Sequence, residues 1–353
     1  MLILAIESSC DETSAAVVEM SDKRRQILSN IVASQISIHR RYGGVVPEIA
    51  SRAHTEVISR ITYEALTEAG LCVGGSDNSD NSDKVNSYNS ALDAIDAVAV
   101  TNAPGLIGAL LVGVGFAKAL AFSHSKPLVA VNHIRGHIAA SYLAYPDLEP
   151  PFLAFVASGG HTSIIDVRTY TDMAEIGHTR DDAVGEAFDK TARAIGLPYP
   201  GGAEMDRLAA LGNASNIKLP SPAIAGEGLE FSFSGLKTAA VNYVNTARMK
   251  NETICREDVA ASLTAVICHA VVEKLALALK STNRKKLVFA GGVAANTHLR
   301  AAIAALCRDM GVSFYVPPVS LCGDNAAMIG AQAYYEYIAG NCADTSLNAY
   351  ASV

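Results

Sequence analysis

Two histidines four residues apart form the clearest chemical motif in this 353-residue sequence. They open and close the segment His133-Ile-Arg-Gly-His137, which we expect to be helical. Positions i and i+4 of a helix share one face, so both imidazoles can reach a single metal ion. A zinc-protease motif would place a glutamate beside the first histidine, where Ile134 stands here. The pair therefore predicts a metal site without protease chemistry; histidines merely exposed on a helix surface are the alternative.

A metal ion held by two histidines is short of ligands, and an oxygen donor would complete the set. Asp324, in the segment Cys-Gly-Asp-Asn before the last expected helix, is the candidate. The same aspartate could instead cap that helix, because Asp is a favoured N-cap residue. Two imidazoles and one carboxylate with open positions suit Zn²⁺ or Fe²⁺ better than Mg²⁺.

Two glycine-rich turns could bind an anion. Ser158-Gly-Gly-His-Thr162 is the expected tip of a hairpin, and Gly291–Asn296 joins an expected strand to a helix. Glycine lets backbone N–H groups approach an anion closely, and a helix N-terminus presents free N–H donors. Tight turns that need a positive φ are the structural alternative. The second turn lacks the G-x-G-x-x-G pattern, which argues against a dehydrogenase.

Acidic residues gather at two further places. The turn Glu7–Thr13 packs acids and hydroxyls together after an apolar strand, which is more than a structural turn needs. The stretch from Asp181 to Asp206 includes Asp189, which lies off the apolar face of its expected helix. Carboxylates suit ribose hydroxyls, and a solvated helix face is the alternative for each of these acids.

The elements that must position these groups alternate between strands and helices. A strand, a small polar turn and a second strand occur in Leu2–Met20 and again in Phe152–Val167, which predicts two similar lobes around a central cleft. Further strands are expected at 97–100, 128–131, 286–290 and 313–316, and helices at 53–69, 106 onward, 133–142, 183–195, 256–279, 296–307 and 324–338. This order predicts an α/β fold. We place the first lobe at 1–131, completed by 324–353, and the second at 132–323.

The composition limits the class of protein and of partner. Half of the residues are apolar and 18% are charged, so a large core can be buried and global disorder is excluded. The net charge of −7 excludes a protein that coats nucleic acid through a general basic field. A polyanion would need a local patch, and the candidates are Lys23-Arg24-Arg25, His39-Arg40-Arg41 and Arg284-Lys285-Lys286.

Cysteine usage and hydropathy indicate a cytoplasmic protein outside the membrane. The seven cysteines are scattered without a Cys-x-x-Cys pair, which fits a reducing compartment. The uncharged run between Asp96 and Lys118 is long enough to span a bilayer, but proline and glycine interrupt it. We interpret it as a buried strand, a turn and a buried helix. The polar, repetitive segment Gly74–Ser90 is predicted to be a flexible, dispensable surface loop.

Taken together, these motifs resemble the tRNA N6-adenosine threonylcarbamoyltransferase family, formerly known as O-sialoglycoprotein endopeptidase. The resemblance runs from Ile6 to Tyr335, nearly the whole chain. The matching stretches are IESSCDETSAAVV, HRRYGGVVPEIASRAH, NHIRGH, VASGGHTS, DDAVGEAFDKTARAIGLPYPGG, FSFSGLKTA, AGGVAANTHLR and CGDNAAMIGAQAYY. Two departures are Arg135, where bacterial relatives often have Glu, and Gly323, where they often have Thr.

The resemblance implies two duplicated lobes of the actin, sugar-kinase and Hsp70 type (ribonuclease H-like) around a nucleotide cleft. It implies that His133, His137 and Asp324 hold one divalent transition metal, Fe²⁺ or Zn²⁺. It implies substrate contacts at Val156, Ala157, Ser158, Gly159, Gly160, Asp189, Gly202, Asp206 and Asn296, and we add Glu12 and His161 as candidates.

The implied reaction transfers a threonylcarbamoyl group from its adenylate to the exocyclic amine of adenosine 37 in tRNAs that read codons beginning with A. No covalent nucleophile is needed, because the acyl group arrives activated. The implied partners are tRNA, a catalytically silent relative of the same fold (TsaB-like) and an ATPase (TsaE-like). A nucleotide-binding small-molecule kinase of the same superfamily is the alternative; it would use the cleft without needing the histidine pair.

Overall fold

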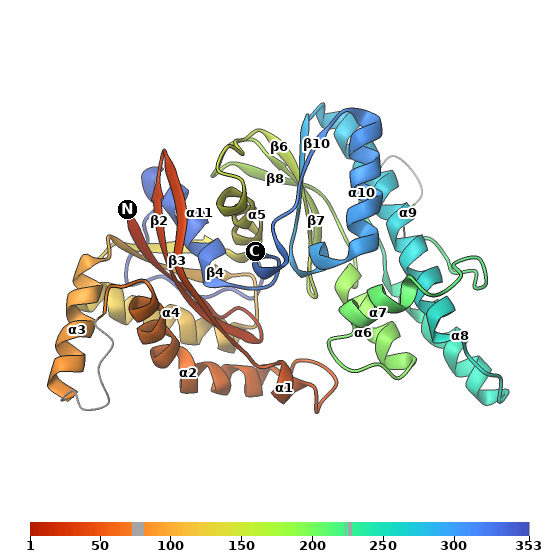
Figure 1. Cartoon of the computed structure of the whole chain (residues 1–353), viewed down its shortest axis with the longest axis horizontal. Helices are drawn as coiled ribbons and strands as arrows, with labels where there is room; N and C mark the ends of the chain where they lie inside the picture. The colour runs from red at the N-terminus through yellow and green to blue at the C-terminus, as the bar shows by residue number, and fades with distance from the viewer. Residues whose placement is uncertain (73–80, 223, 225–227, 353) are drawn as a thin grey trace. The chain divides into compact units, whose positions relative to one another are not determined.

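The computed structural model describes residues 1–72, 81–222, 224 and 228–352. Its contacts divide the chain into two compact units. Unit 1 comprises Met1–Leu148 and Gly323–Val353, and unit 2 comprises Glu149–Cys322. Both contain a mixed sheet with helices (Figure 1).

The sheet of unit 1 has the strand order β3-β2-β1-β4-β5. β1 is antiparallel to β2 and parallel to β4, while β3 pairs with β2 and β5 with β4. The strands are β1 (Leu2–Glu7), β2 (Glu12–Ser21), β3 (Arg24–Ser34), β4 (Ala97–Ala103) and β5 (Leu128–Asn132). The helices are α1 (Ile36–His39), α2 (Pro47–Glu68), α3 (Asn81–Ala94), α4 (Ile107–Ser123), α5 (His133–Ala144) and α11 (Ala326–Ile338).

Both faces of this sheet are covered, which explains the unbroken apolar run in β1. Ile6 packs in a cluster with Leu110 and Val114 of α4. Successive strand residues point to opposite faces, so Ala5 lies on the other side, against α11. A Cβ at Gly330 of α11 would come within 3.3 Å of the Ala5 Cβ. The last helix of the chain therefore returns to the first strand.

Unit 2 repeats this pairing. Its order, β8-β7-β6-β9-β10, again joins an antiparallel three-stranded part to a parallel one. Its strands are β6 (Phe152–Ala157), β7 (Thr162–Val167), β8 (Met173–His178), β9 (Lys286–Ala290) and β10 (Ser313–Tyr315). Its helices are α6 (Val184–Ala194), α7 (Gly202–Ala209), α8 (Ser234–Met249), α9 (Arg256–Thr282), η1 (Gly292–Ala295), α10 (Thr297–Met310) and η2 (Val319–Leu321). The two-lobed α/β fold and its duplication are confirmed.

The helix α5 belongs to unit 1, whereas the expected boundary at residue 132 puts it in the second lobe. The reason is close packing between α5 and α11. A Cβ at Gly136 of α5 would lie 2.6 Å from Cδ1 of Ile329 in α11, so a larger residue there would have to displace this side chain. The elements β3, β8, α1, α7 and α8 are present as well, and no local pattern was strong enough to predict them.

The prediction of a loop over Gly74–Ser90 is wrong for its second part, and its first part, up to residue 80, lies outside the described residues. The helix α3 begins at Asn81. Tyr88, Leu92 and Ile95 follow one another at helical spacing and pack beside Leu66 and other residues of unit 1. Leu92 and Ile95 lie after the polar segment Gly74–Ser90, so the composition of that segment gave no sign of the packing that stabilises the helix.

The apolar helices belong to the cores of their units. α4, in the uncharged run, buries Ala109, Leu110 and Val114, as expected. Within the described chain, α9 is the one helix with the length and hydropathy of a membrane span. Its residues Leu263 and Ile267 lie in the core cluster of unit 2, so it is a core helix.

Candidate metal centre

The site lies where the parallel strands of unit 1 end. β1 ends at Glu7, Thr101 lies near the end of β4, and β5 leads directly into α5. Carboxyl ends of neighbouring parallel strands meet at one edge of a sheet, which is the usual place for a ligand. The Asn132 side chain accepts hydrogen bonds from the backbone N–H groups of Ile134 and Arg135 and so caps α5. This cap places His133 at the first position of the helix, at the sheet edge.

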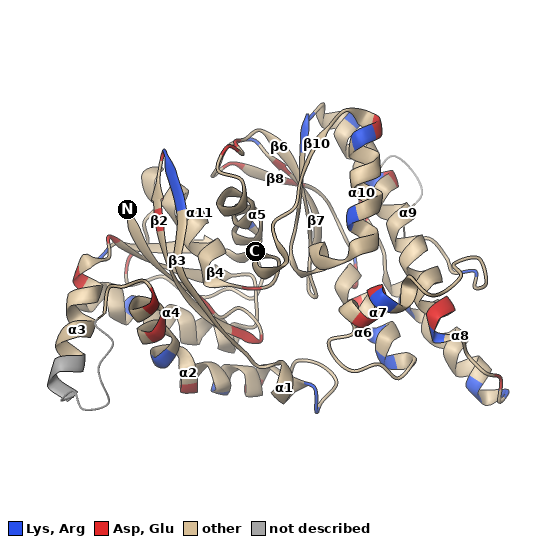
Figure 2. Cartoon of the chain, viewed as in Figure 1, with Lys and Arg blue, Asp and Glu red and all other residues tan. Residues whose placement is uncertain are grey.

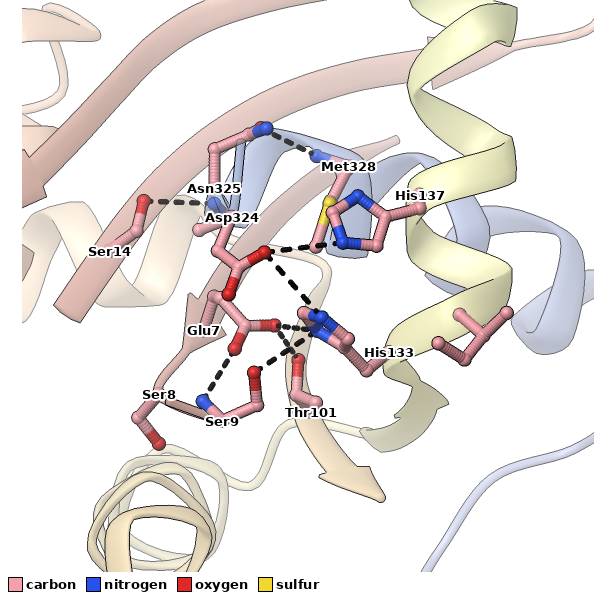
Figure 3. A network of polar contacts seen from close by, with 12 residues as sticks. Glu7, Ser8, Ser9, Ser14, Thr101, His133, His137, Asp324, Asn325 and Met328 are labelled. Carbon is pink, nitrogen blue, oxygen red and sulfur yellow. Dashed lines mark hydrogen bonds and ion pairs between the residues drawn. The ribbon is translucent and has the colours of Figure 1, made fainter. Parts of the chain in front are cut away.

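The two histidines and Asp324 converge, as the sequence predicted (Figure 3). Oδ1 of Asp324 lies 3.2 Å from Nε2 of His137 and 3.5 Å from Nε2 of His133. Both histidines are buried, and Asp324 is half-buried. One oxygen therefore faces two imidazole nitrogens in a sheltered position.

Asn325, and not Asp324, caps α11. The Asn325 side chain accepts the hydrogen bond from the Met328 N–H. Ser14 of β2 accepts from the Ala326 N–H and ties the same helix end to the sheet. The alternative that Asp324 is the N-cap is therefore wrong, and its carboxylate points toward the histidines (Figure 3).

The three side chains fit a transition metal. Tetrahedral bonds of about 2.0–2.1 Å place neighbouring ligand atoms roughly 3.3 Å apart, and the two nitrogen–oxygen distances lie on either side of that value. Nδ1 of His137 has no hydrogen-bond partner among the described residues, although the ring is fully buried. Its Nε2 faces the Asp324 oxygen at 3.2 Å, and a cation bound between these two atoms would satisfy both of them.

The electrostatics of the centre also favour a cation. Burial by itself would lower the pKa of His133, but the carboxylates of Asp324 and Glu7 outweigh it and raise that pKa to about 9. Burial would raise the pKa of Glu7, yet His133 holds it below the ordinary value. The carboxylates around the imidazoles thus stabilise positive charge at this spot.

Glu7 is a member of the site that the sequence singled out only as part of an acidic turn. Its Oε2 lies 3.2 Å from Nδ1 of His133 and accepts a 2.5 Å hydrogen bond from the Thr101 hydroxyl. Its Oε1 accepts from the Ser9 N–H at 2.5 Å, and Oγ of Ser9 lies 3.1 Å from Nδ1 of His133. The carboxylate is fully buried. The sequence indicated only that the acidic turn as a whole could be functional. The structure shows that Glu7 is the residue of this turn whose carboxylate faces His133.

Glu12, a further candidate, lies at the other end of this turn. Its Oε1 accepts a hydrogen bond from the Ser34 hydroxyl at 3.0 Å. Burial, reinforced by Asp11 and Asp324, raises the pKa of Glu12 to about 9. It does not belong to the group of metal-ligating atoms found in the described part of the chain.

Apart from Glu12, the candidate substrate contacts lie in unit 2, and the hairpin between β6 and β7 holds several of them. Val156 and Ala157 are buried strand residues, while Gly159 and Gly160 are exposed. The Ser158 N–H donates to the carbonyl of His161, and the His161 N–H donates to Oγ of Ser158. These bonds close the turn, and the two glycine residues at its tip are exposed to solvent.

The remaining candidates lie on α6, on α7 and at the start of α10. Asn296 caps this helix by accepting from the Leu299 N–H. Asp206 of α7 accepts hydrogen bonds from the backbone N–H and hydroxyl of Thr297 and lies 2.7 Å from Nδ1 of His298. Asp189 accepts from the Gly201 N–H at 2.7 Å, beside Gly202, the first residue of α7. Each acid thus has a structural role in the chain as described.

Most of the basic clusters have structural partners. Arg24 pairs with Glu19, and Arg25 lies over the ring of Tyr142 at 5.6 Å. Arg284 pairs with Asp166 through two hydrogen bonds. The inclusion of His39 in a surface cluster is wrong, because its ring is fully buried against Gln35. Arg40 and Arg41, directly after α1, are exposed. Figure 2 shows the blue of Lys and Arg on the ribbon just beyond α1.

Comparisons with known proteins agree with this arrangement. A family model for TsaD, tRNA N6-adenosine threonylcarbamoyltransferase, matches residues 26–77 and 83–331. The tRNA N6-adenosine threonylcarbamoyltransferase of Clostridium botulinum (strain 657) is 51% identical over 347 residues, 98% of this chain and 96% of that relative. The protein of the same name from Clostridium perfringens (strain 13) is 48% identical over 348 residues, 99% of this chain and 96% of that relative.

Solved structures share the fold at low identity. Component A of the (R)-2-hydroxyglutaryl-CoA dehydratase of Acidaminococcus fermentans aligns with a TM-score of 0.54 and 15% identity, over 96% of this chain and 99% of that chain. Full-length HypF in its phosphate- and nucleotide-bound form aligns with a TM-score of 0.58 and 13% identity, over 100% of this chain and 47% of that chain. Likeness at this identity shows the fold alone, which is the actin-like α/β fold.

Proposed function

Because the chain belongs to the tRNA N6-adenosine threonylcarbamoyltransferase family, we propose that it transfers the threonylcarbamoyl group of threonylcarbamoyl-adenylate to adenosine 37 of tRNAs that read codons beginning with A. The exocyclic amine attacks the carbamoyl carbon, a new C–N bond forms, the bond to the phosphate oxygen breaks, and AMP leaves. The amine loses one proton in the process. The observation that carries this proposal is the convergence of His133, His137 and Asp324 in a chain that matches the family over nearly its full length.

His133, His137 and Asp324 would hold one Fe²⁺ or Zn²⁺ ion. When bound, such an ion supplies Lewis-acid stabilisation of negative charge on substrate oxygens. The chain contributes a buried cradle that keeps the three ligand atoms within 4.8 Å of one another. Buried carboxylates near the histidines keep this cradle negative, which favours the loaded state.

Residues of unit 2 would bind the adenylate. We assign its phosphate or carbamoyl oxygens to the turn Ser158–Gly160, because its two exposed glycine residues offer N–H donors to anions. We assign the adenosine to Asp189, Gly202, Asp206 and Asn296, where two carboxylates could accept ribose hydroxyls. Val156 and Ala157 support the turn from the buried strand β6, and Glu12 and His161 are further candidates.

Two protein partners, a TsaB-like relative of the same fold and a TsaE-like ATPase, are proposed from the family, together with a cytoplasmic location. An apolar surface supports the presence of a partner. Ile107 and Leu111 of α4 lie one helical turn apart, and each is nearly half exposed, at 47% and 48%. Exposed apolar side chains grouped in this way are typical of interaction surfaces.

The test is direct reconstitution. The chain is incubated with tRNA, threonylcarbamoyl-adenylate and the two partners. The tRNA is then digested, and its nucleosides are identified by mass spectrometry. We expect threonylcarbamoyl-adenosine to form with the native chain and to be lost after treatment with a chelator. No modified nucleoside with native, metal-loaded chain and both partners present would overturn the proposal.

A further inference from the structure

The two histidines of the metal centre differ in what their second ring nitrogen contacts. Nδ1 of His133 lies 3.2 Å from Oε2 of Glu7 and 3.1 Å from Oγ of Ser9, whereas Nδ1 of His137 has no hydrogen-bond partner in the described chain. Glu7 and His133 are 126 positions apart, and both are at least 95% buried. A buried carboxylate placed against one ligand and not the other requires an explanation.

The carboxylate of Glu7 is itself held in position by two donors. The Ser9 N–H can only donate, and it binds Oε1 at 2.5 Å. The hydroxyl of Thr101, which is fully buried, binds Oε2 at 2.5 Å. Oε2 is the oxygen that faces the imidazole, so Glu7 is oriented before any ligand arrives. Strands β1 and β4, which carry Glu7 and Thr101, are neighbours in the sheet and fix this geometry.

We propose that Glu7 is the positioning residue of the metal centre, and that it fixes His133 in the tautomer with hydrogen on Nδ1. An ionised carboxylate only accepts, and the Ser9 hydroxyl on the same nitrogen can accept as well, so the imidazole donates from Nδ1. The lone pair then lies on Nε2, the nitrogen that faces Oδ1 of Asp324 at 3.5 Å. Hydrogen bonding of a carboxylate to a ligand histidine orients the ring and makes it a stronger ligand. This inference rests on the metal-binding part of the proposed function and not on the transfer reaction.

The test measures metal binding alone, without tRNA or adenylate. Glu7→Gln keeps the size of the side chain and removes its charge, and we expect the affinity for Zn²⁺ to fall about 10- to 100-fold. Thr101→Val leaves the carboxylate of Glu7 in place but removes one of its two donors. It should lower the affinity for Zn²⁺ several-fold. Asp93→Asn is the matched control, because Asp93 also faces a histidine nitrogen, Nδ1 of His124, at 3.0 Å, away from the centre. Its affinity for Zn²⁺ should equal that of the native chain.

A spectroscopic readout separates positioning from general stability. Nitrogen NMR of the Zn²⁺-loaded native chain should show His133 protonated on Nδ1, and Co²⁺ in Glu7→Gln should give a shifted visible absorption band. The NMR measurement needs no variant, so it stands even if Glu7→Gln fails to fold. Hydrogen on Nε2 of His133, or a folded Glu7→Gln that binds Zn²⁺ as tightly as the native chain, would overturn the proposal. Loss of transfer activity with normal Zn²⁺ binding would count against the proposed function only.

Discussion

The two units share one hairpin design but differ in the groups that its turn presents. In unit 1 the strands β1 and β2 are joined by Ser8–Asp11, and in unit 2 the strands β6 and β7 are joined by Ser158–His161. Both connections have four residues and both follow the central strand of their sheet. The first is mostly buried and rich in side-chain donors and acceptors, and the second exposes two glycine residues. Duplication of the scaffold therefore does not require duplication of the site.

The difference comes from the elements that cover each turn. In unit 1, His54 of α2 lies 2.7 Å from the Thr13 hydroxyl and 3.0 Å from the Cys10 carbonyl. The Leu106 N–H also donates to the carbonyl of Ser9, so the turn is enclosed. In unit 2, the start of α6 contacts the turn through Gly185, whose N–H donates to the Ser158 carbonyl. A covered turn can support buried ligands, whereas an open turn offers its backbone.

His137→Ala is the strongest test of the idea that unit 1 holds a ligand through buried side chains. The change removes one of three ligand atoms, and we expect the affinity for Zn²⁺ to fall by more than about 100-fold. This is more than the loss expected when a hydrogen-bond partner of a ligand is changed. Transfer activity should be lost with it. Isothermal calorimetry with Zn²⁺ measures the effect, and His124→Ala, outside the centre, is the control. Undiminished Zn²⁺ binding would show that the convergence of these side chains has no role in metal binding.

Two glycine substitutions test the idea that unit 2 presents the backbone of its turn to a ligand. Gly291 has a φ of +90°, and a Cβ there would lie 2.3 Å from the Ala157 carbonyl oxygen. Gly291→Ala should therefore lower the free energy of unfolding by about 2–3 kcal/mol, seen as a lower melting temperature. A Cβ at Gly160 meets nothing within 4 Å, so Gly160→Ala should fold normally.

Gly160→Ala should nevertheless raise KM for threonylcarbamoyl-adenylate several-fold, because a methyl group on the open turn hinders the approach of an anion to its N–H groups. Steady-state kinetics with saturating tRNA measure this. An unchanged KM would place the anion elsewhere and remove the backbone role that distinguishes the two hairpins.

A third test concerns the chain between the third and fourth strands, where the units differ most. The family match omits residues 78–82, while α3 packs through Leu92, which is 2% exposed. Deletion of 78–82 should leave melting and Zn²⁺ binding unchanged. Leu92→Ala should lower the free energy of unfolding by about 2–3 kcal/mol, measured by urea denaturation. A large loss from the short deletion would show that the omitted residues are structural in this chain.

The sequence was sufficient for features that depend on local pattern. The alternation of strands and helices, the two hairpins and the histidine spacing are all local, and each appears in the structure. Asp324 could be named as a candidate, but its release from helix capping depends on Asn325 and Ser14, which no spacing rule connects. Contacts between distant positions, such as Glu7 with His133, arise from strand order and could not be predicted locally. The same holds for α3, which is stabilised by packing against unit 1 rather than by its own composition.

The smallest expected effect concerns the segment directly after the third strand of each sheet. In unit 1, β3 leads to α1 and then to the exposed Arg40 and Arg41. In unit 2, β8 leads to Asp181, whose carboxylate accepts hydrogen bonds from Ser232 and Phe233. One segment is therefore basic and exposed, and the other is acidic and hydrogen-bonded within its unit. Of the three basic clusters, the one at Arg40 and Arg41 is the candidate for contact with tRNA phosphates.

Arg40→Ala/Arg41→Ala should weaken tRNA binding modestly and flatten its dependence on salt. Each phosphate contact releases counterions and adds about one unit to the slope of log affinity against log salt, so the slope should fall by about two. The net charge of −7 opposes docking of a polyanion, which makes a local pair of arginines more important. Filter binding over a range of salt, with and without the partners, gives the slope. Arg60→Ala, whose arginine already pairs with Glu64, is the control. The same slope in the double variant and the native chain, in both settings, would place the tRNA on another surface and leave the metal centre unaffected.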